Sequence, residues 1–124
     1  MNYAADSKTM KEIDSFSINY GMPSLVLMER AAYSVCEEII KNESKKSSIL
    51  VICGYGNNGG DGIAIARILR EFGYYADILM VGNSQKRTED NEKQEKIAKK
   101  LVNYVNKSKI FEYNIIVDAI FGIG

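Results

Sequence analysis

The sequence predicts an α/β fold in which parallel strands alternate with helices. Three short, mainly apolar runs, residues 49–53, 75–81 and 114–122, are typical of strands buried inside a parallel sheet. Amphipathic stretches with helical spacing separate these runs. The resulting order of strand, helix, strand, helix, strand predicts a doubly wound unit with right-handed crossovers, preceded by two further helices.

The two leading helices are predicted from their apolar spacing and their end signals. Residues 7–20 repeat apolar side chains on one helical face and are followed by Gly21, a helix stop. Residues 24–42 repeat the pattern directly after Pro23, a residue that favours helix starts. A polar connector then leads into the first strand.

The later helices lie between the strands. Residues 61–73 carry an apolar face and end at Gly73. Residues 84–105 are charged at first and amphipathic afterwards, so we expect one helix with a solvated charged face. Three strands make a small sheet for this architecture. We therefore expect further strands outside this chain, with a natural minimal domain as the alternative.

Composition excludes several classes of function. Sixteen basic residues balance sixteen acidic ones, so no net field favours nucleic acid or an anionic membrane. No apolar run approaches the ~20 residues that span a bilayer, and no signal peptide pattern begins the chain. We expect a cytoplasmic protein with a small-molecule substrate. The chain has no histidine, and Cys36 and Cys53 are expected to be buried thiols, so a bound cation would need oxygen ligands.

A glycine-rich loop, "CGYGNNGGDG" at residues 53–62, follows the first strand and precedes a helix. Gly54–Gly59 has the spacing of a dinucleotide-binding fingerprint. That fingerprint also requires an acidic residue at the end of the second strand, whereas the acid of this strand, Asp77, lies near its start. A conventional nicotinamide dehydrogenase is therefore disfavoured.

The chemistry of the loop indicates a polar ligand. Gly59, Gly60 and Gly62 leave backbone N–H groups uncovered near a helix N-terminus, an arrangement that attracts phosphate. Asn57 and Asn58 add both hydrogen-bond donors and acceptors. A glycine turn that serves structure alone would not require two adjacent asparagines.

Two carboxylates belong to the same expected edge of the sheet. Asp61 is a candidate N-cap for the helix that we expect to start near Gly62. Asp118 ends the apolar run "IIVD" of the third strand, where an unpaired charge would be costly to desolvate. Asp118 either accepts hydrogen bonds from the next loop or pairs with Asn58 around a monovalent or divalent cation.

Three segments together resemble one protein family. The segments are "MKEIDSFSINYGMPSLVLMERAA", "GYGNNGGDGIAIARIL" and "VDAIFGIG". They are similar, in the same order, to segments of the NAD(P)H-hydrate epimerases, the YjeF N-terminal-type domain. The family's aspartate-proline-serine-glycine segment is absent. We therefore expect residues 1–124 to be the N-terminal portion of one such domain, incomplete at its C-terminus.

The resemblance implies a fold and a function. The fold is a Rossmann-like three-layer αβα sandwich with a mainly parallel sheet and two N-terminal helices. The function is that of an isomerase which interconverts the R and S epimers of hydrated NADH and NADPH, with bound K⁺ and as a homodimer. A non-catalytic nucleotide-binding or scaffold module of the same fold is the alternative.

The resemblance also implies site residues. The implied substrate-binding residues are Asn57, Asn58, Gly59, Gly60, Asp61, Gly122, Ile123 and Gly124, and the implied potassium ligands are Asn58 and Asp118. The catalytic acid and base stay unassigned. Asp61 is the nearest candidate in this chain, and the absent segment is the stronger one.

Overall fold

The computed structural model describes residues 2–4 and 23–120. Its strands are β1 (Asn2–Ala4), β2 (Ser48–Cys53), β3 (Tyr75–Met80), β4 (Asn103–Tyr104) and β5 (Ile115–Ala119). Its helices are α2 (Ser24–Asn42), α3 (Asn57–Glu71) and α4 (Glu89–Ala98), with short 3₁₀ turns η1 (Ser84–Lys86) and η2 (Lys107–Glu112). Among these residues, no helix is long and apolar enough to cross a membrane.

The strands form one sheet in the order β1-β5-β2-β3-β4, and all four neighbouring pairs are parallel. The predicted α/β class with a parallel sheet is confirmed. The predicted number of strands is too small, because β1 and β4 add an edge strand on each side. These strands have only three and two residues, too few to show a period of two in the sequence.

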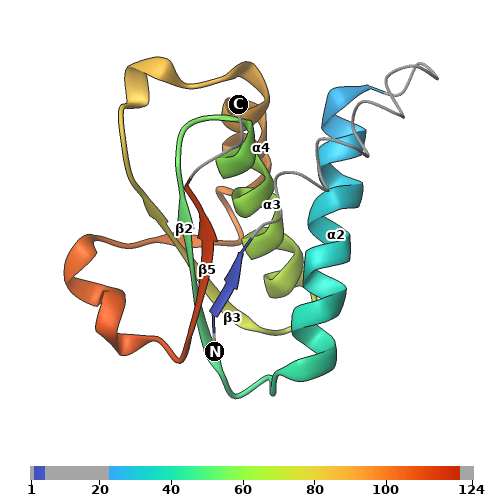
Figure 1. Ribbon diagram of the computed structural model, residues 1–124, viewed down its shortest axis with the longest axis vertical. Coiled ribbons are helices and arrows are strands. Elements are labelled where there is room, and N and C mark those ends of the chain that lie inside the picture. Colours follow the sequence, from blue (N-terminus) through green and yellow to red (C-terminus); the bar gives the residue numbers. More distant parts are fainter. Residues whose placement is uncertain (1, 5–22, 121–124) are drawn as a thin grey trace.

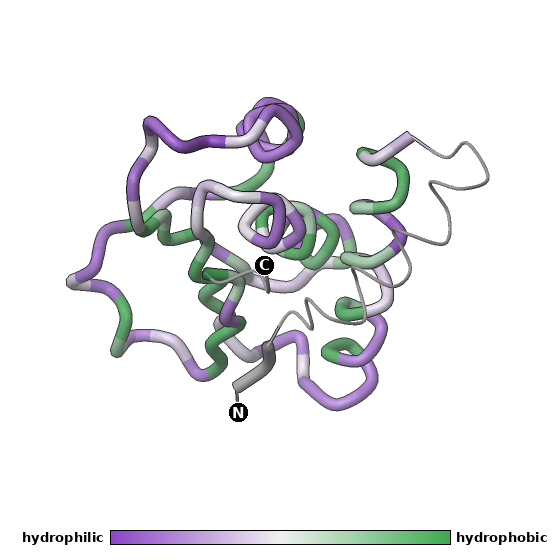
Figure 2. The backbone as a smooth tube through the Cα atoms, turned by 45° about the horizontal axis from the view of Figure 1, so that its top comes forward, coloured by the Kyte–Doolittle hydropathy of each residue, from purple (hydrophilic) through white to green (hydrophobic). Residues whose placement is uncertain are grey.

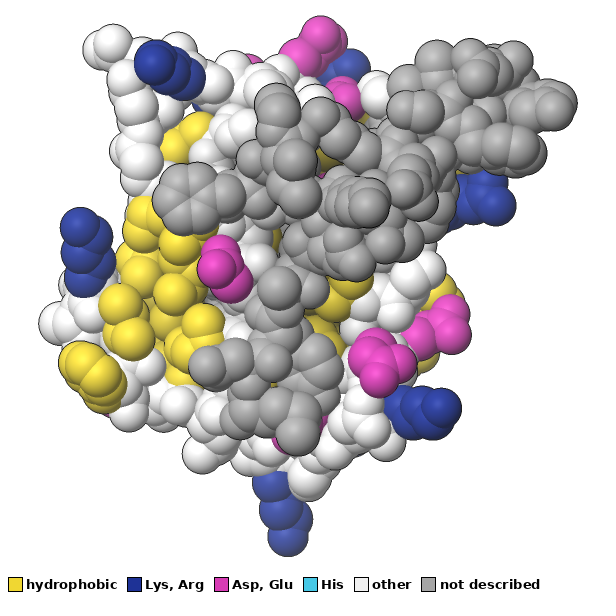
Figure 3. Space-filling model, viewed as in Figure 1, with side chains coloured by type: hydrophobic (Ala, Val, Ile, Leu, Met, Phe, Trp, Pro, Cys, Tyr) yellow, Lys and Arg dark blue, Asp and Glu magenta, His cyan; other side chains and the backbone are white. Residues whose placement is uncertain are grey.

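The helices lie on one face of the sheet because of the order of the strands. The connections through α2, α3 and α4 all run in the same direction along the sheet. Right-handed crossovers therefore place these helices on the same face, as Figure 1 shows. The return connection from β4 to β5 runs the other way and carries η2 over the opposite face. Figure 3 shows apolar side chains gathered on that side, where Phe111 of η2 is almost fully exposed.

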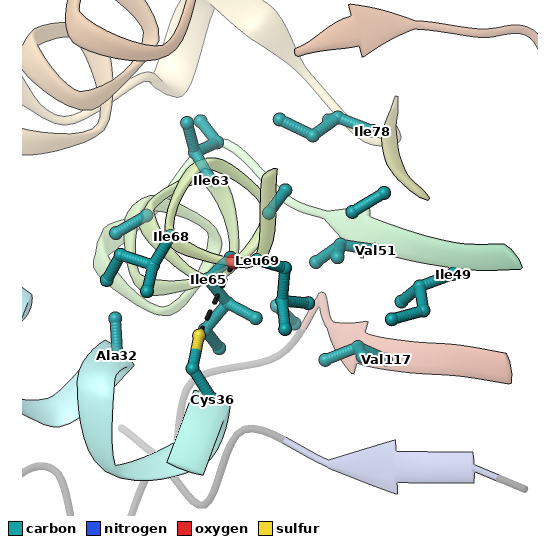
Figure 4. Close-up of a cluster of buried hydrophobic side chains, with 14 of the residues drawn as sticks. Ala32, Cys36, Ile49, Val51, Ile63, Ile65, Ile68, Leu69, Ile78 and Val117 are labelled. Atoms are coloured by element: carbon teal, nitrogen blue, oxygen red, sulfur yellow. Dashed lines mark hydrogen bonds between the residues drawn. The ribbon is translucent and has the colours of Figure 1, made fainter. Parts of the chain in front are cut away.

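Helix α3 is the centre of the core. It lies between α2, α4 and the sheet, as the tilted view in Figure 2 shows. Figure 4 shows Leu69 of α3 directed toward Val51 of β2 and Val117 of β5, whereas Ile68 lies on the side of the helix away from these strands. Gly62 allows this close approach, because a Cβ there would lie 2.5 Å from the Cβ of Ala119 and 2.8 Å from the sulfur of Cys53. Helix–sheet packing thus accounts for this glycine.

Both cysteines are free and buried, as predicted. Cys36 donates its thiol hydrogen to the carbonyl of Ile65 at 3.4 Å, which joins α2 to α3 (Figure 4). Burial raises the pKa of Cys36 to about 12. Burial also raises the pKa of Cys53 far above its ordinary value. Both groups are therefore neutral packing residues at physiological pH.

The predicted bounds of two helices are wrong, and those of a third are confirmed. The predicted bounds of α2 agree with the structure. Helix α3 begins at Asn57, so Asp61 lies inside its first turns and Gly56 occupies the N-cap position. Asp61 is therefore not the N-cap. Helix α4 ends at Ala98, because Asn103–Tyr104 pair with β3 instead of continuing the helix. The helix predicted over residues 7–20 lies outside the described residues.

A closed polar network lies near the amino ends of the strands. The carboxylate of Asp77 accepts a hydrogen bond from Arg70 Nη2 at 2.6 Å and another from Tyr113 Oη at 2.6 Å. Arg70 also donates to the carbonyl of Ala76 and lies over the ring of Tyr75. This network satisfies the buried carboxylate of Asp77 within the chain and stabilises the start of β3.

Candidate functional site

The glycine loop lies where β2 and β5 end side by side. Gly54 donates its N–H to the carbonyl of Ala119 at 3.1 Å, which ties the loop to the end of β5. The loop then enters α3, whose first internal hydrogen bond runs from Gly60 N–H to the carbonyl of Gly56 at 3.0 Å. Ligands of parallel α/β sheets bind outside the carboxyl ends of the strands, the edge that this loop occupies.

The glycines of the loop have two different physical roles. A Cβ on Gly59 would lie 1.9 Å from the carbonyl oxygen of Gly54, so the backbone there is too close for any side chain. A Cβ on Gly56 would meet no atom within 4 Å. Neither role involves a left-handed backbone, since the described glycines with positive φ are Gly73 and Gly82. Gly59 allows two backbone segments to pack closely, and Gly56 leaves the backbone uncovered where no other atom lies nearby.

The implied substrate residues differ in exposure. Asn57 is exposed at the start of α3, whereas Asn58 and Asp61 are 8% and 6% exposed. Gly59 and Gly60 are buried between the loop and the helices. The structure therefore brings these five residues together in the first turns of α3, with Asn57 the most accessible.

Asp118 lies at the same edge as the glycine loop. The register places Asp118 beside Ile52, two residues before Gly54. Its side chain is exposed, and its Oδ1 accepts a hydrogen bond from the N–H of Ile120 at 3.1 Å. The predicted hydrogen bond between Asp118 and the following loop is thus confirmed for one carboxylate oxygen, Oδ1. Its pairing with Asn58 around a cation stays a prediction.

The other implied substrate residues, Gly122, Ile123 and Gly124, lie outside the described residues.

The electrostatics of this edge favour an anion at the N-terminus of α3. The N-terminus of α3 carries partial positive charge and no acidic residue in its first turn. Within residues 2–4 and 23–120, no group of three or more cysteine and acidic side chains could hold a metal ion. The predicted cation ligands, Asp118 and Asn58, carry a carboxylate and a carboxamide oxygen, which suit a hard cation better than a soft metal ion.

One buried residue at this edge was missed from the sequence. Asn91 of α4 donates both hydrogens of its amide to the loop, to the carbonyl of Gly54 at 3.0 Å and that of Gly56 at 2.8 Å. The prediction of a solvated face for the charged stretch is wrong at Asn91 and Gln94, which are fully buried. A signal was present, because these are uncharged amides three residues apart among charged neighbours.

A separate hollow of about 690 Å³ lies between α2 and α3. Its floor includes Arg67, whose guanidinium is ion-paired with Glu29 and with Glu71. Its rim includes Tyr33 and Phe72, whose rings lie 6.1 Å apart. The charge of Arg67 is already balanced by two carboxylates, so this residue offers an anion in the hollow no uncompensated positive charge.

Comparisons with known proteins agree with this arrangement. Residues 24–124 match the family described as YjeF-related protein N-terminus. An NAD(P)H-hydrate epimerase of Weissella koreensis is 46% identical over 127 residues, which cover 100% of this chain and 58% of that protein. One of Limosilactobacillus reuteri is 43% identical over 122 residues, with coverage of 95% and 58%.

A solved structure shares the fold. The crystal structure of the yeast protein ynu0 superposes with a TM-score of 0.69 at 31% identity, and the match covers 94% of this chain and 55% of that one. This chain thus spans somewhat more than half the length of the proteins that it matches. On these matches, together with the glycine loop at the carboxyl edge of a parallel sheet, the chain belongs to the YjeF-related protein N-terminus family.

Proposed function

We propose that the protein containing this chain interconverts the R and S epimers of hydrated NADH and NADPH, as an isomerase that repairs nicotinamide cofactors. The observation that carries the proposal is the glycine loop, which presents Asn57, Asn58 and the N-terminus of α3 at the ligand-binding edge of the sheet. Relatives that are 43% and 46% identical carry the name of this activity.

The N-terminus of α3 binds the phosphates of the nucleotide in this proposal. Gly60 is the first residue whose N–H is used inside the helix, so the N–H groups of Asn57 and Gly59 are directed beyond it. The bare backbone at Gly56 lets a phosphate approach without steric conflict. Gly122, Ile123 and Gly124 stay proposed phosphate contacts on the strength of the family resemblance.

Potassium is the proposed cofactor, held by the oxygens of Asn58 and Asp118. The donors fit a hard ion in chemical type, since one is a carboxylate and the other a carboxamide. The exposure of Asp118, with only Oδ1 bonded to the loop among the described residues, leaves its Oδ2 open to a ligand. The ion would supply a fixed positive charge beside the nucleotide.

The chemistry requires an acid and a base at C6 of the hydrated ring. The ring nitrogen helps to expel the C6 hydroxyl once that oxygen is protonated, and water then adds to the opposite face and returns a proton. One carboxyl group can donate the first proton and accept the second. The role stays unassigned in this chain, because Asp61 is buried within α3 and Asp118 is the proposed ion ligand.

The test measures turnover of the R epimer. Full-length protein is mixed with both epimers of NADPH hydrate and with a dehydratase that consumes only the S form. We expect the R form to disappear much faster than it does spontaneously, and faster in K⁺ than in Na⁺. An R-epimer decay equal to the spontaneous rate in both salts would refute the proposed activity.

Two other functions are distinguished by related observations. A non-catalytic binding or scaffold module would bind NADPH hydrate in a calorimeter without accelerating epimerisation. A conventional dehydrogenase would need an acid at the carboxyl end of β3, whereas Asp77 is engaged near the amino end with Arg70 and Tyr113. That engagement favours the epimerase over the dehydrogenase.

The assembly and location of the protein are also proposals. We propose a homodimer in the cytoplasm, acting on a small molecule and on neither nucleic acid nor membrane. The balanced charge of the chain supports the proposal that nucleic acids and membranes are not partners, because a chain without net charge does not attract a nucleic acid or an anionic membrane. Sedimentation velocity of the full-length protein would measure its oligomeric state directly.

A further inference from the structure

Asn91 is held in one orientation by three side-chain hydrogen bonds. The residue is fully buried, and its Oδ1 accepts a hydrogen bond from Arg87 Nε at 2.7 Å. Its Nδ2 donates to the carbonyls of Gly54 and Gly56 at 3.0 and 2.8 Å. Because the guanidinium of Arg87 can only donate, the amide oxygen must face it and the amide nitrogen must face the loop.

These bonds determine the direction of two peptide planes in the glycine loop. In a planar trans peptide, the carbonyl of one residue and the N–H of the next point in opposite directions. The carbonyls of Gly54 and Gly56 both point at Asn91. The N–H groups of Tyr55 and Asn57 therefore point away from Asn91. Asn91 thus orients the N–H of Tyr55 and, together with the hydrogen bond from Gly60 N–H to the carbonyl of Gly56, the N–H of Asn57 at the entry to α3.

Further contacts attach the start of α4 to the same loop. Thr88 donates its N–H to the carbonyl of Tyr55 at 3.0 Å, and its Oγ1 caps α4 by accepting from the N–H of Asn91 at 3.3 Å. The guanidinium of Arg87 lies 5.3 Å from the centre of the Tyr55 ring. A Cβ on Gly60 would come within 3.3 Å of the Cα of Asn91, so the two helices are also in close contact here.

We infer that Asn91 is a positioning residue of the proposed epimerase, which turns the N–H groups of Tyr55 and Asn57 toward the phosphates of the hydrated nucleotide. Asn91 itself touches no substrate in this assignment. The inference rests on the proposed function for its substrate, and on the described hydrogen bonds for its geometry. It predicts an effect on substrate affinity that a purely structural role would not have.

Gln94 provides the matched control. It is a second fully buried amide, one turn further along α4, and its Nε2 donates to Glu29 of α2 at 3.2 Å. Among the described residues, its side chain forms no hydrogen bond with the glycine loop. Replacing Gln94 perturbs the packing of α4 to a similar extent while the peptide planes at Gly54 and Gly56 keep their hydrogen bonds.

The experiment compares Asn91→Ala, Asn91→Asp and Gln94→Leu in the full-length protein. Asn91→Asp keeps the volume of the side chain but sets a carboxylate oxygen against two carbonyls, so it serves if the alanine variant does not fold. For both Asn91 variants we expect KM for the hydrate to rise roughly tenfold to a hundredfold, because misdirected N–H groups no longer donate hydrogen bonds to the charged phosphates. We expect kcat to change about twofold or less. Gln94→Leu should leave KM unchanged.

A binding measurement separates this inference from the proposed function. Calorimetric titration with NADPH, which carries the same phosphates and needs no turnover, should show the same weakening for Asn91→Asp and none for Gln94→Leu. If the wild-type protein has no epimerase activity but Asn91→Asp still binds NADPH more weakly than the wild type, the proposed activity is refuted and the positioning role is supported. Equal KM and NADPH affinity in folded Asn91→Asp and wild-type protein would overturn the positioning role.

Discussion

Two aspartates on the same face of the sheet have opposite surroundings. Asp77 of β3 and Asp118 of β5 both alternate with residues that face α3, so both side chains lie on the other face. Asp77 is 1% exposed and uses both carboxylate oxygens, for Arg70 and Tyr113. Asp118 is exposed and uses one oxygen, for the N–H of Ile120.

The difference separates a structural end of the sheet from the end at which we propose that the ligand binds. Near the amino ends of the strands, the chain supplies its own cation and hydroxyl donor, so the carboxylate of Asp77 is satisfied on folding. At the carboxyl ends, Gly56, Asn57 and Asp118 are exposed. The same residue type therefore stabilises the fold at one end and is available for binding at the other.

The largest expected effect is a loss of stability from a steric clash in the glycine loop, at the carboxyl ends of the strands. Gly59→Ala would set a Cβ 1.9 Å from the carbonyl oxygen of Gly54, and neither backbone segment can move without disturbing β2 or α3. We expect the free energy of unfolding of the full-length protein to fall by about 3 kcal/mol or more, measured by urea denaturation. Gly56→Ala, which meets no atom within 4 Å, is the control and should change it by about 1 kcal/mol or less. Equal stability of the two variants would contradict this account.

A second, smaller effect is expected at the amino end. Asp77→Asn removes the charge that balances Arg70 and leaves a neutral amide in a site 1% exposed. We expect a loss of about 2 kcal/mol in the same unfolding measurement, because Arg70, the partner left uncompensated, is only partly buried. KM for the proposed substrate should not change, since this network lies at the far end of the strands. An altered KM with unchanged stability would reverse the roles given to the two ends.

The smallest expected effect on stability is at Asp118. Asp118→Asn should change the free energy of unfolding by about 0.5 kcal/mol or less, because the side chain is exposed and the amide oxygen can still accept from Ile120. The variant should lose the faster rate in K⁺ over Na⁺ that we propose for the wild type. Glu112→Gln, an exposed carboxylate on η2, is the control and should keep that difference. A destabilisation as large as that of Asp77→Asn would show that Asp118 is structural.

Much of the fold could be predicted because its signals are local. The three central strands are continuous apolar runs, and α2 repeats its buried side chains every three to four residues between Pro23 and a polar connector. The glycine loop could be placed at the sheet edge because it directly follows a strand and precedes a helix. These features depend on neighbours in the sequence, and the structure agrees with them.

The features that were missed depend on partners far along the chain. Strand β4 interrupts a helical pattern because its residues pair with β3, and α3 starts before Asp61 because the loop glycines accept helical geometry against the sheet. Asn91 bonds carbonyls 37 and 35 residues away, so the partners of this amide could not be inferred from its neighbours in the sequence.

The sequence by itself determined the class of fold, the buried thiols and the polar groups offered at one edge of the sheet. Hydrophobic period and glycine spacing suffice for these properties, because each depends on only a few consecutive residues. Only the tertiary structure decided that Asp77 is buried and Asp118 exposed, and that the side-chain amide of Asn91 bonds the glycine loop. Those outcomes depend on hydrogen bonds between elements that meet only after the strands have paired.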